Sequence, residues 1–414
     1  TEDVVDKSLK RLFTARFLLG MFDPPEMVTY AQIPYEVNDS EEHRALATQA
    51  ARESIVLLKN EGDFLPLDKN IKSIAIVGPS ADGLDVLVGN YHGDPSKFTT
   101  FLQGIKNKVE TNTEVYYAKG CDLFDKNTDG FSEAIEIAKE SDVVIMVLGI
   151  SAQFESEEGA GQRSEAKGDR VDLNLPGVQE ELLKEIHATN KQIILVLTSG
   201  SALSVNFANE HVPAILEVWY PGEEGGAALA DIIFGDYNPA GRLPVTFYKT
   251  IDQVPDFRNY NMEGRTYRYF KGEPLYSFGY GLSYTKFKYS NLQISPEAKT
   301  DENISVSVDV DNIGEKLGDE VIQLYLSKGS ISSEAPIREL QGFERITFKV
   351  GDKKTVSFTL KPENLSIFDE NGNQIVKPGK ISISIGGCQP GFSKDKVNIV
   401  DGSFELIGDI IKIE

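Results

Sequence analysis

The middle of the chain alternates short apolar runs with segments of helical periodicity. In the helical segments, apolar residues recur three and four positions apart, as at Val178, Leu182, Leu183 and Ile186, which places them on one face of a helix. The apolar runs are too short for helices and are typical of strands buried on both faces. They are residues 74–77, 115–117, 143–148, 193–197 and 214–218. The alternation predicts a three-layer α/β sandwich with a mostly parallel sheet over residues 41–285.

Two helices are predicted before this sheet. The first carries Val5, Leu9, Leu12, Phe13 and Leu19 at helical spacing, so we expect it to bury one face and to end at Asp23-Pro24-Pro25, where proline removes an amide donor. For the second, Asp39 and Glu42 form a capping box. Its apolar side is predicted to be Leu46, Ala50, Ile55 and Leu58, with an end near residues 59–62.

The pattern changes after about residue 286. ISVSVDVDN, EVIQLYLS, KTVSFTLKP and GKISISIGG alternate apolar and polar residues with period two. Turn residues separate these segments, and no helical pattern intervenes. Short strands at this spacing predict an antiparallel β-sandwich over residues 286–414, with the boundary between 281 and 290.

Charge and composition narrow the functional classes. Of 414 residues, 40% are apolar and 26% charged, which is enough apolar side chain for a folded core. The chain has 64 acidic and 42 basic residues and a formal charge of -22. This charge disfavours nucleic acid and anionic membrane as partners and fits a neutral substrate.

No cofactor or metal site is indicated by sequence motifs. Cys121 and Cys388 are far apart without a CxxC spacing, and the four histidines are scattered, which predicts neither a disulfide framework nor a zinc site. The glycine-rich segment GPSADG (78–83) follows a predicted strand but matches neither nucleotide-binding fingerprint. We therefore interpret it as a strand-end turn. Of the three functional hypotheses for this chain, a nucleotide-binding protein is the least favoured.

The acidic stretch at residues 154–179, FESEEGAGQRSEAKGDRVDLNLPGVQ, is the candidate for chemistry. Glu155, Glu157, Glu158 and Glu165 lie within eleven residues of each other, directly after the predicted strand 143–148. By composition alone, such a loop is more often a solvated surface. However, ligands bind beyond the carboxyl ends of parallel strands. A carboxylic acid there could protonate a leaving group if burial or a like charge raised its pKa.

Several long motifs resemble glycoside hydrolase family 3, the β-glucosidases and β-xylosidases. They occur in the family's order: RFLLGMFDPPE, HRALATQAARESIVLLKNEGDFLPL, IAIVGPSAD, VGNYHG, VVIMVLGISAQFESEE, GDRVDLNLPGVQ, WYPGEEGGAALADIIFGDYNPAGRLPVTF and RTYRYFKGEPLYSFGYGLSYTKF. The FDPPE and FESEE forms are most similar to the β-xylosidase-like members.

The resemblance implies an α/β sandwich followed by a fibronectin type III-like domain. It also implies a TIM-like barrel that carries an aspartate nucleophile and is not in this sequence. Residues 1–40 resemble that barrel's final helix and linker, so we expect the chain to begin partway through a longer polypeptide. The implied partners are an oligosaccharide or β-glycoside substrate and the N-terminal barrel half. The implied location is periplasmic or extracellular.

The resemblance also ranks the general acid/base candidates. Glu157 ranks first, because it matches the commoner pattern of the family. Glu155 ranks second, because it has the offset from Gly149 that is found in other branches. Glu165 ranks third and resembles a form found in some plant glucanases. Arg170 is expected to be a structural ion-pair partner. The alternative function is a non-catalytic carbohydrate-binding or scaffolding module.

Three aromatic residues have side chains that could stack on a sugar ring or fill a core. Tyr91, Trp219 and Tyr267 could stack on a sugar, but the numbers of such residues favour core positions. Tyr267, in RTYRYF, is expected at an interdomain surface.

Overall fold

The computed structural model describes residues 1–155, 170–392 and 398–413. The chain divides into two compact units, Thr1–Ala47 and Thr48–Glu414. In the first, helix α1 (Glu2–Leu18) is followed by the 3-10 turns η1 (Pro25–Met27), η2 (Thr29–Gln32) and η3 (Tyr35–Val37). No residue of α1 is buried. The prediction that α1 ends at the prolines was wrong, because the chain already leaves the helix at Gly20, whose φ is +67°.

Helix α2 (Glu41–Ser54) is shorter than predicted. Its first turn is capped by Ser40, whose Oγ accepts a hydrogen bond from His43 N–H at 3.4 Å, one residue after the predicted cap. Leu58 is not on the helix. Strand β1 (Val56–Asn60) begins two residues after the helix ends, and its first three residues are buried. A continuous apolar run fits either element, and burial on both faces selects the strand.

A six-stranded sheet in the order β1-β6-β5-β4-β2-β3 forms the centre of the α/β domain. Only the pairing of β1 with β6 is antiparallel, so the mostly parallel sheet is confirmed. The strands are β2 (Ser73–Val77), β3 (Glu114–Ala118), β4 (Val143–Gly149), β5 (Gln192–Thr198) and β6 (Ala214–Glu217). The helices are η4 (Glu61–Asp63), α3 (Phe101–Lys108), α4 (Phe131–Glu140), α5 (Gln179–His187), α6 (Asn206–His211), α7 (Gly225–Ile233), η5 (Ile251–Gln253) and α8 (Thr266–Tyr269).

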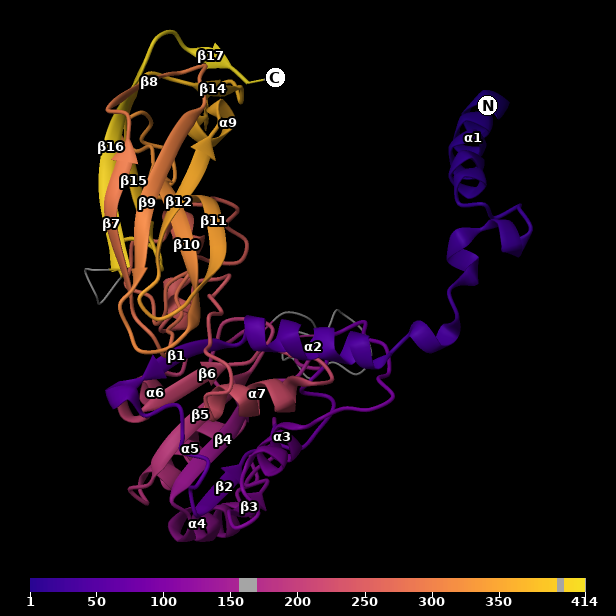
Figure 1. The fold of residues 1–414 in the computed structure, drawn as a ribbon, viewed down its shortest axis with the longest axis vertical. Coiled ribbons are helices and arrows are strands. Elements are labelled where there is room, and N and C mark those ends of the chain that lie inside the picture. The colour runs from indigo at the N-terminus through magenta and orange to yellow at the C-terminus, as the bar shows by residue number, and fades with distance from the viewer. Residues whose placement is uncertain (156–169, 393–397, 414) are drawn as a thin grey trace. The chain divides into compact units, whose positions relative to one another are not determined.

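Helices cover both faces of this sheet (Figure 1). Along β2, Ile74 and Ile76 pack with α3 and α7, whereas Ala75 and Val77 pack with α4 and α5. This period of two explains why the predicted strands are apolar at every position. The predicted three layers are therefore confirmed.

Helices α3 and α7 contact each other through two glycines. A Cβ on Gly104 would lie 2.0 Å from the carbonyl oxygen of Gly226, and a Cβ on Gly226 would lie 1.9 Å from that of Thr100. Gly104 of α3 and Gly226, the last residue of the segment GEEGG, thus allow close packing of backbone on backbone.

The C-terminal domain is a β-sandwich with one core between its two main sheets. Their strand orders are β11-β10-β15-β16-β8 and β12-β9-β7, and a small third sheet has the order β13-β14-β17. The elements are β7 (Phe287–Ile294), β8 (Glu297–Lys299), β9 (Ile304–Asn312), β10 (Gly318–Ser327), β11 (Glu339–Phe348), β12 (Lys353–Leu360), α9 (Pro362–Leu365), β13 (Ile367–Phe368), β14 (Gln374–Val376), β15 (Gly379–Gly386), β16 (Ile399–Ile407) and β17 (Ile411–Lys412).

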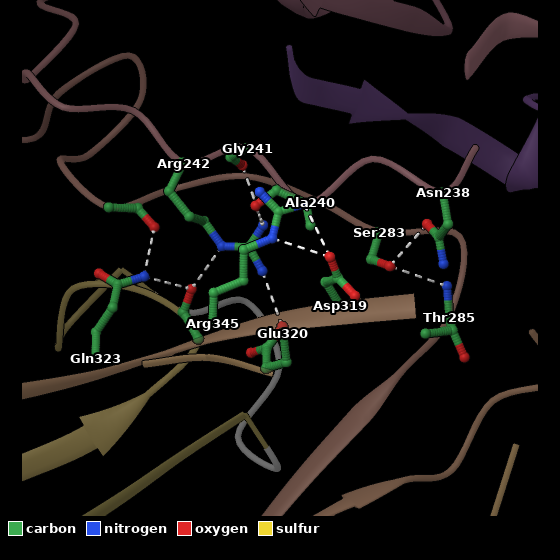
Figure 2. Close-up of polar contacts among 12 residues, drawn as sticks. Asn238, Ala240, Gly241, Arg242, Ser283, Thr285, Asp319, Glu320, Gln323 and Arg345 are labelled. Carbon is green, nitrogen blue, oxygen red and sulfur yellow. Dashed lines mark hydrogen bonds and ion pairs between the residues drawn. The ribbon is translucent and has the colours of Figure 1, made fainter. Parts of the chain in front are cut away.

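A buried ion pair joins the two domains within the second unit (Figure 2). Arg242 donates from Nη2 to Glu320 Oε2 at 2.9 Å, and the side chains are only 10% and 4% exposed. Arg242 Nη1 also donates to the carbonyls of Ala240 and Gly241. The other oxygen of Glu320 accepts from Tyr289 Oη at 2.7 Å. Because hydrogen bonds as well as the ion pair compensate both charges, the pair can be buried without leaving an uncompensated charge.

Candidate active site

Glu155 lies beyond the carboxyl ends of β4 and β5 and is held by several donors. Its carboxylate accepts hydrogen bonds from the Gly200 backbone N–H at 2.7 Å and from the hydroxyls of Ser201 and Tyr220. Its own carbonyl accepts from Asn90 Nδ2 at 3.1 Å. The donors come from loops that follow β2, β5 and β6. Glu155 therefore fastens the start of the acidic loop to three neighbouring loops at one edge of the sheet.

Arg170 lies close to this carboxylate. Its Nη1 donates to Ser201 Oγ at 2.7 Å and to the Ala202 carbonyl at 2.9 Å. Ser201 thus contacts both Arg170 and Glu155. Burial lowers the pKa of Arg170, while the charge of Glu155 opposes this shift. Within the described ranges the bonds of Arg170 are to neutral oxygens and it forms no salt bridge, so its expected role as a structural ion-pair partner stays a prediction.

Glu217 is a second carboxyl group at this edge and is completely buried. Its Oε1 accepts from the Trp219 backbone N–H at 3.0 Å and from Ser199 Oγ at 3.2 Å. Its Oε2 has no hydrogen-bond partner among the described residues. Burial raises the pKa of Glu217 well above its ordinary value, which these hydrogen bonds only partly offset; the negative charge of Glu155 raises it further.

The bonds of Glu217 hold an unusual backbone turn. Trp219 has a φ of +60°, a left-handed conformation that is unfavourable for a bulky residue. The next residue, Tyr220, donates to Glu155, and burial raises its pKa far above the ordinary value of 10. The neutral phenol is thus kept as a donor. Glu217, Tyr220 and Glu155 form one connected cluster.

The two carboxyl groups at this edge differ in environment. Glu155 accepts three hydrogen bonds on its carboxylate oxygens, whereas Glu217 is enclosed with one oxygen unpartnered. Of the three predicted acid/base candidates, the structure places only Glu155. Glu157 and Glu165 lie outside the described residues, and their roles stay predictions.

Sequence reasoning missed Ser199, Gly200, Ser201, Glu217 and Tyr220 as members of this cluster. The available signal was their position, because each lies within three residues of the end of β5 or β6. Parallel neighbouring strands bring such positions together.

The aromatic predictions have mixed outcomes. Tyr91 is 86% exposed, so its expected core position was wrong. Trp219 packs edge-on against Phe247 at 6.2 Å between ring centroids, next to the core. Tyr267 Oη accepts from the Leu340 N–H of β11 at 3.1 Å, which confirms its predicted interdomain position.

The part of the chain that the structure describes contains no group of three or more His, Cys, Asp or Glu side chains placed to hold a metal ion. In the same ranges, no helix has the length and apolar character needed to cross a bilayer.

Both domains of the chain match known domain families. The glycosyl hydrolase family 3 C-terminal domain matches residues 55–284, and a fibronectin type III-like domain matches residues 320–389. The chain belongs to glycoside hydrolase family 3. Its β-sandwich is therefore fibronectin type III-like, as predicted.

Relatives in this family are glycosidases. A β-xylosidase of Formosa agariphila is 39% identical over 92% of this chain and 53% of its own length. A periplasmic β-glucosidase of Salmonella typhimurium is 35% identical over 97% of the chain and 55% of its own length. The structure of a Listeria innocua β-glucosidase with isofagomine has a TM-score of 0.85 at 28% identity, covering 99% of this chain and 56% of that one. The chain spans about half the length of these relatives.

Proposed function

We propose that this chain supplies the general acid/base for retaining exo-hydrolysis of β-linked xylosides or glucosides. The names of its family 3 relatives support this substrate class. The aspartate nucleophile would come from an N-terminal barrel of the same enzyme, because a retaining glycosidase needs two carboxyl groups about 5–5.5 Å apart.

Glu157 is our candidate for the acid/base. The supporting observation is the anchoring of Glu155, two residues earlier in the chain. Since the Glu155 carboxylate is occupied by Gly200, Ser201 and Tyr220, it is suited to positioning the loop rather than to exchanging protons. A proton donor must reach the leaving group's oxygen. Glu157 is two residues after Glu155, so we expect the hydrogen bonds of Glu155 to limit where Glu157 can lie. Glu165 is the remaining candidate.

The surroundings of Glu155 fit a sugar site. Asn90, which donates to the Glu155 carbonyl, is followed in the sequence by Tyr91, an exposed residue whose aromatic side chain is of the kind that sugars stack on. The periplasmic relative supports a periplasmic or extracellular location, where such an enzyme would meet oligosaccharides.

Reconstitution tests this proposal. The 414-residue chain would be mixed with the barrel half and assayed with an aryl β-xyloside and an aryl β-glucoside. We expect turnover only when both halves are present. A barrel half that is equally active alone, with the chain adding only sugar affinity, would instead assign a non-catalytic carbohydrate-binding or scaffolding role.

A further inference from the structure

A cavity of about 640 Å³ lies at the opposite edge of the sheet, where the parallel strand β6 begins. The end of β1 places it there, because Asn60 pairs with Ala214, the first residue of β6. Its volume falls within the roughly 300–1,000 Å³ usual for small-molecule sites. Residues that matter for its chemistry are Lys59, Asn209, Lys249, Glu273, Ser277 and Tyr280.

Ser277 brings an unsatisfied hydroxyl to this cavity. The residue is only 4% exposed, and its Oγ has no hydrogen-bond partner among the residues that the structure describes. A buried hydroxyl without a partner is unfavourable by about 1–3 kcal/mol. A bound molecule with hydroxyl groups would remove that penalty.

Four of the five charged residues that line the cavity form ion pairs with each other. Lys59 pairs with Glu61 at 3.2 Å, and Lys249 pairs with Glu273 at 2.9 Å. All four residues line the cavity. Because each cation has an adjacent anion and Glu210 adds a further negative charge to the lining, an anionic ligand is disfavoured relative to a neutral one.

Aromatic rings provide an apolar wall. Tyr276 and Tyr280 stack with centroids 5.6 Å apart, and Phe392 from the β-sandwich domain also lines the cavity. The Tyr276 hydroxyl donates to Asn209 Oδ1 at 3.0 Å, which orients the Asn209 amide. Rings combined with hydroxyl and amide groups suit a ligand with both apolar and hydroxyl-bearing faces.

The cavity continues toward the domain interface. A neighbouring cavity of about 240 Å³ shares Asn60, Tyr280 and Leu282 with it. Arg242 and Glu320, shown in Figure 2, line that neighbour.

We infer that this cavity is a second carbohydrate-binding site, which takes a short neutral oligosaccharide with one hydroxyl on Ser277 Oγ. The inference is independent of the proposed catalytic role, because none of its residues belongs to the Glu155 cluster. A site of this kind would hold an oligosaccharide on the chain without cleaving it.

Lysine labelling tests the site on the intact 414-residue chain. Lys249 lines the cavity and is 39% exposed; Lys69 is the matched control, because it is 40% exposed, is also paired with a carboxylate and lies elsewhere. We expect xylotriose to slow acetylation of Lys249 several-fold and to leave Lys69 unchanged. Equal labelling of Lys249 with and without saturating xylotriose would overturn the inference.

A pair of serine variants tests the contact itself. Ser277→Ala should raise the Kd for xylotriose by about 3- to 10-fold, the value of one neutral hydrogen bond, without lowering Tm. Ser151→Ala is the control, because its buried Oγ is also unpartnered in the described chain but follows β4 at the other edge. Binding that is lost in Ser151→Ala and kept in Ser277→Ala would place the sugar at the Glu155 edge and refute the second site. Glucuronate should bind neither form tightly.

Discussion

The backbone N–H of Gly200 donates a hydrogen bond to Oε2 of Glu155 at 2.7 Å. The two residues are 45 positions apart in the sequence and are brought together because β4 and β5 are parallel neighbours. This bond, with those from Ser201 and Tyr220, gives the acidic loop a fixed starting point on the sheet. The proposed acid/base role of Glu157 depends on that fixed point.

Removing the anchor should destabilise this edge. Glu155→Ala leaves the donors of Gly200, Ser201 and Tyr220 without their acceptor, so we expect a loss of at least about 1–3 kcal/mol in the free energy of unfolding. Urea denaturation measures it. Tyr220→Phe is the control, because it removes one donor and should cost only about 0.5–1.5 kcal/mol. An unchanged unfolding free energy in Glu155→Ala would refute the anchoring role.

Glu217 should make stability depend on pH. Its folded-state pKa is raised well above the ordinary value of 4.5, first by burial. The folded protein therefore holds a proton that the unfolded chain releases above about pH 4.5, so stability is greatest at or below that pH and falls as pH rises toward the folded pKa.

The Glu217→Gln variant tests this pH dependence. Glutamine keeps the acceptor oxygen for Trp219 N–H and Ser199 but carries no titrating proton. We expect its stability relative to the native chain to improve steadily as pH rises above 4.5, by at most about 1.4 kcal/mol per pH unit. Parallel stability curves for the two proteins, measured by thermal unfolding across pH, would show that Glu217 does not titrate in this way.

The interdomain ion pair should be sensitive to loss of one member. Glu320→Ala leaves the Arg242 charge, 10% exposed, without its carboxylate, so we expect a loss of about 3–5 kcal/mol. The exposed pair Lys299–Glu302 is the control; Glu302→Ala should leave stability nearly unchanged, because solvent screens the pair. Similar effects from both variants would mean that the interdomain contact is not tightly held.

A side-chain atom added at the contact between α3 and α7 should lower the stability of the fold. A Cβ at Gly104 would lie 2.0 Å from the backbone oxygen of Gly226, so Gly104→Ala should destabilise the chain by at least about 1–3 kcal/mol through overpacking. Gly329 has nothing within 4 Å of an added Cβ, and Gly329→Ala should be close to neutral. A neutral Gly104→Ala in calorimetry would contradict the packing described.

The sheet was predictable because its parallel strands are short, consist mostly of apolar residues and are separated by helices with a clear apolar face. The same signal misled at Leu58, where the apolar run after α2 continues the helical spacing but belongs to β1. Burial on both faces and the antiparallel pairing with β6 distinguish the strand from a continued helix.

The candidate site was predictable only in part. Glu155 could be predicted from its position directly after β4. Glu217 could not, because its neighbours in the sequence, AILEVWY, indicate only a buried strand. Its importance comes from Ser199 and from the left-handed turn at Trp219, both of which depend on tertiary contacts. Likewise, the exposure of Tyr91 follows from a loop conformation that composition does not encode.

The most direct test of the central claim is the dependence of activity on the leaving group in Glu157→Gln, measured with the chain and its barrel half together. We predict that hydrolysis of a β-xyloside with a poorly acidic alcohol as leaving group falls by about 10²–10⁴-fold, because that group must be protonated as it departs. An aryl β-xyloside with a strongly acidic phenol needs little protonation and should lose far less. Equal losses for both substrates, or no loss for either, would contradict the assignment of Glu157 as the acid/base.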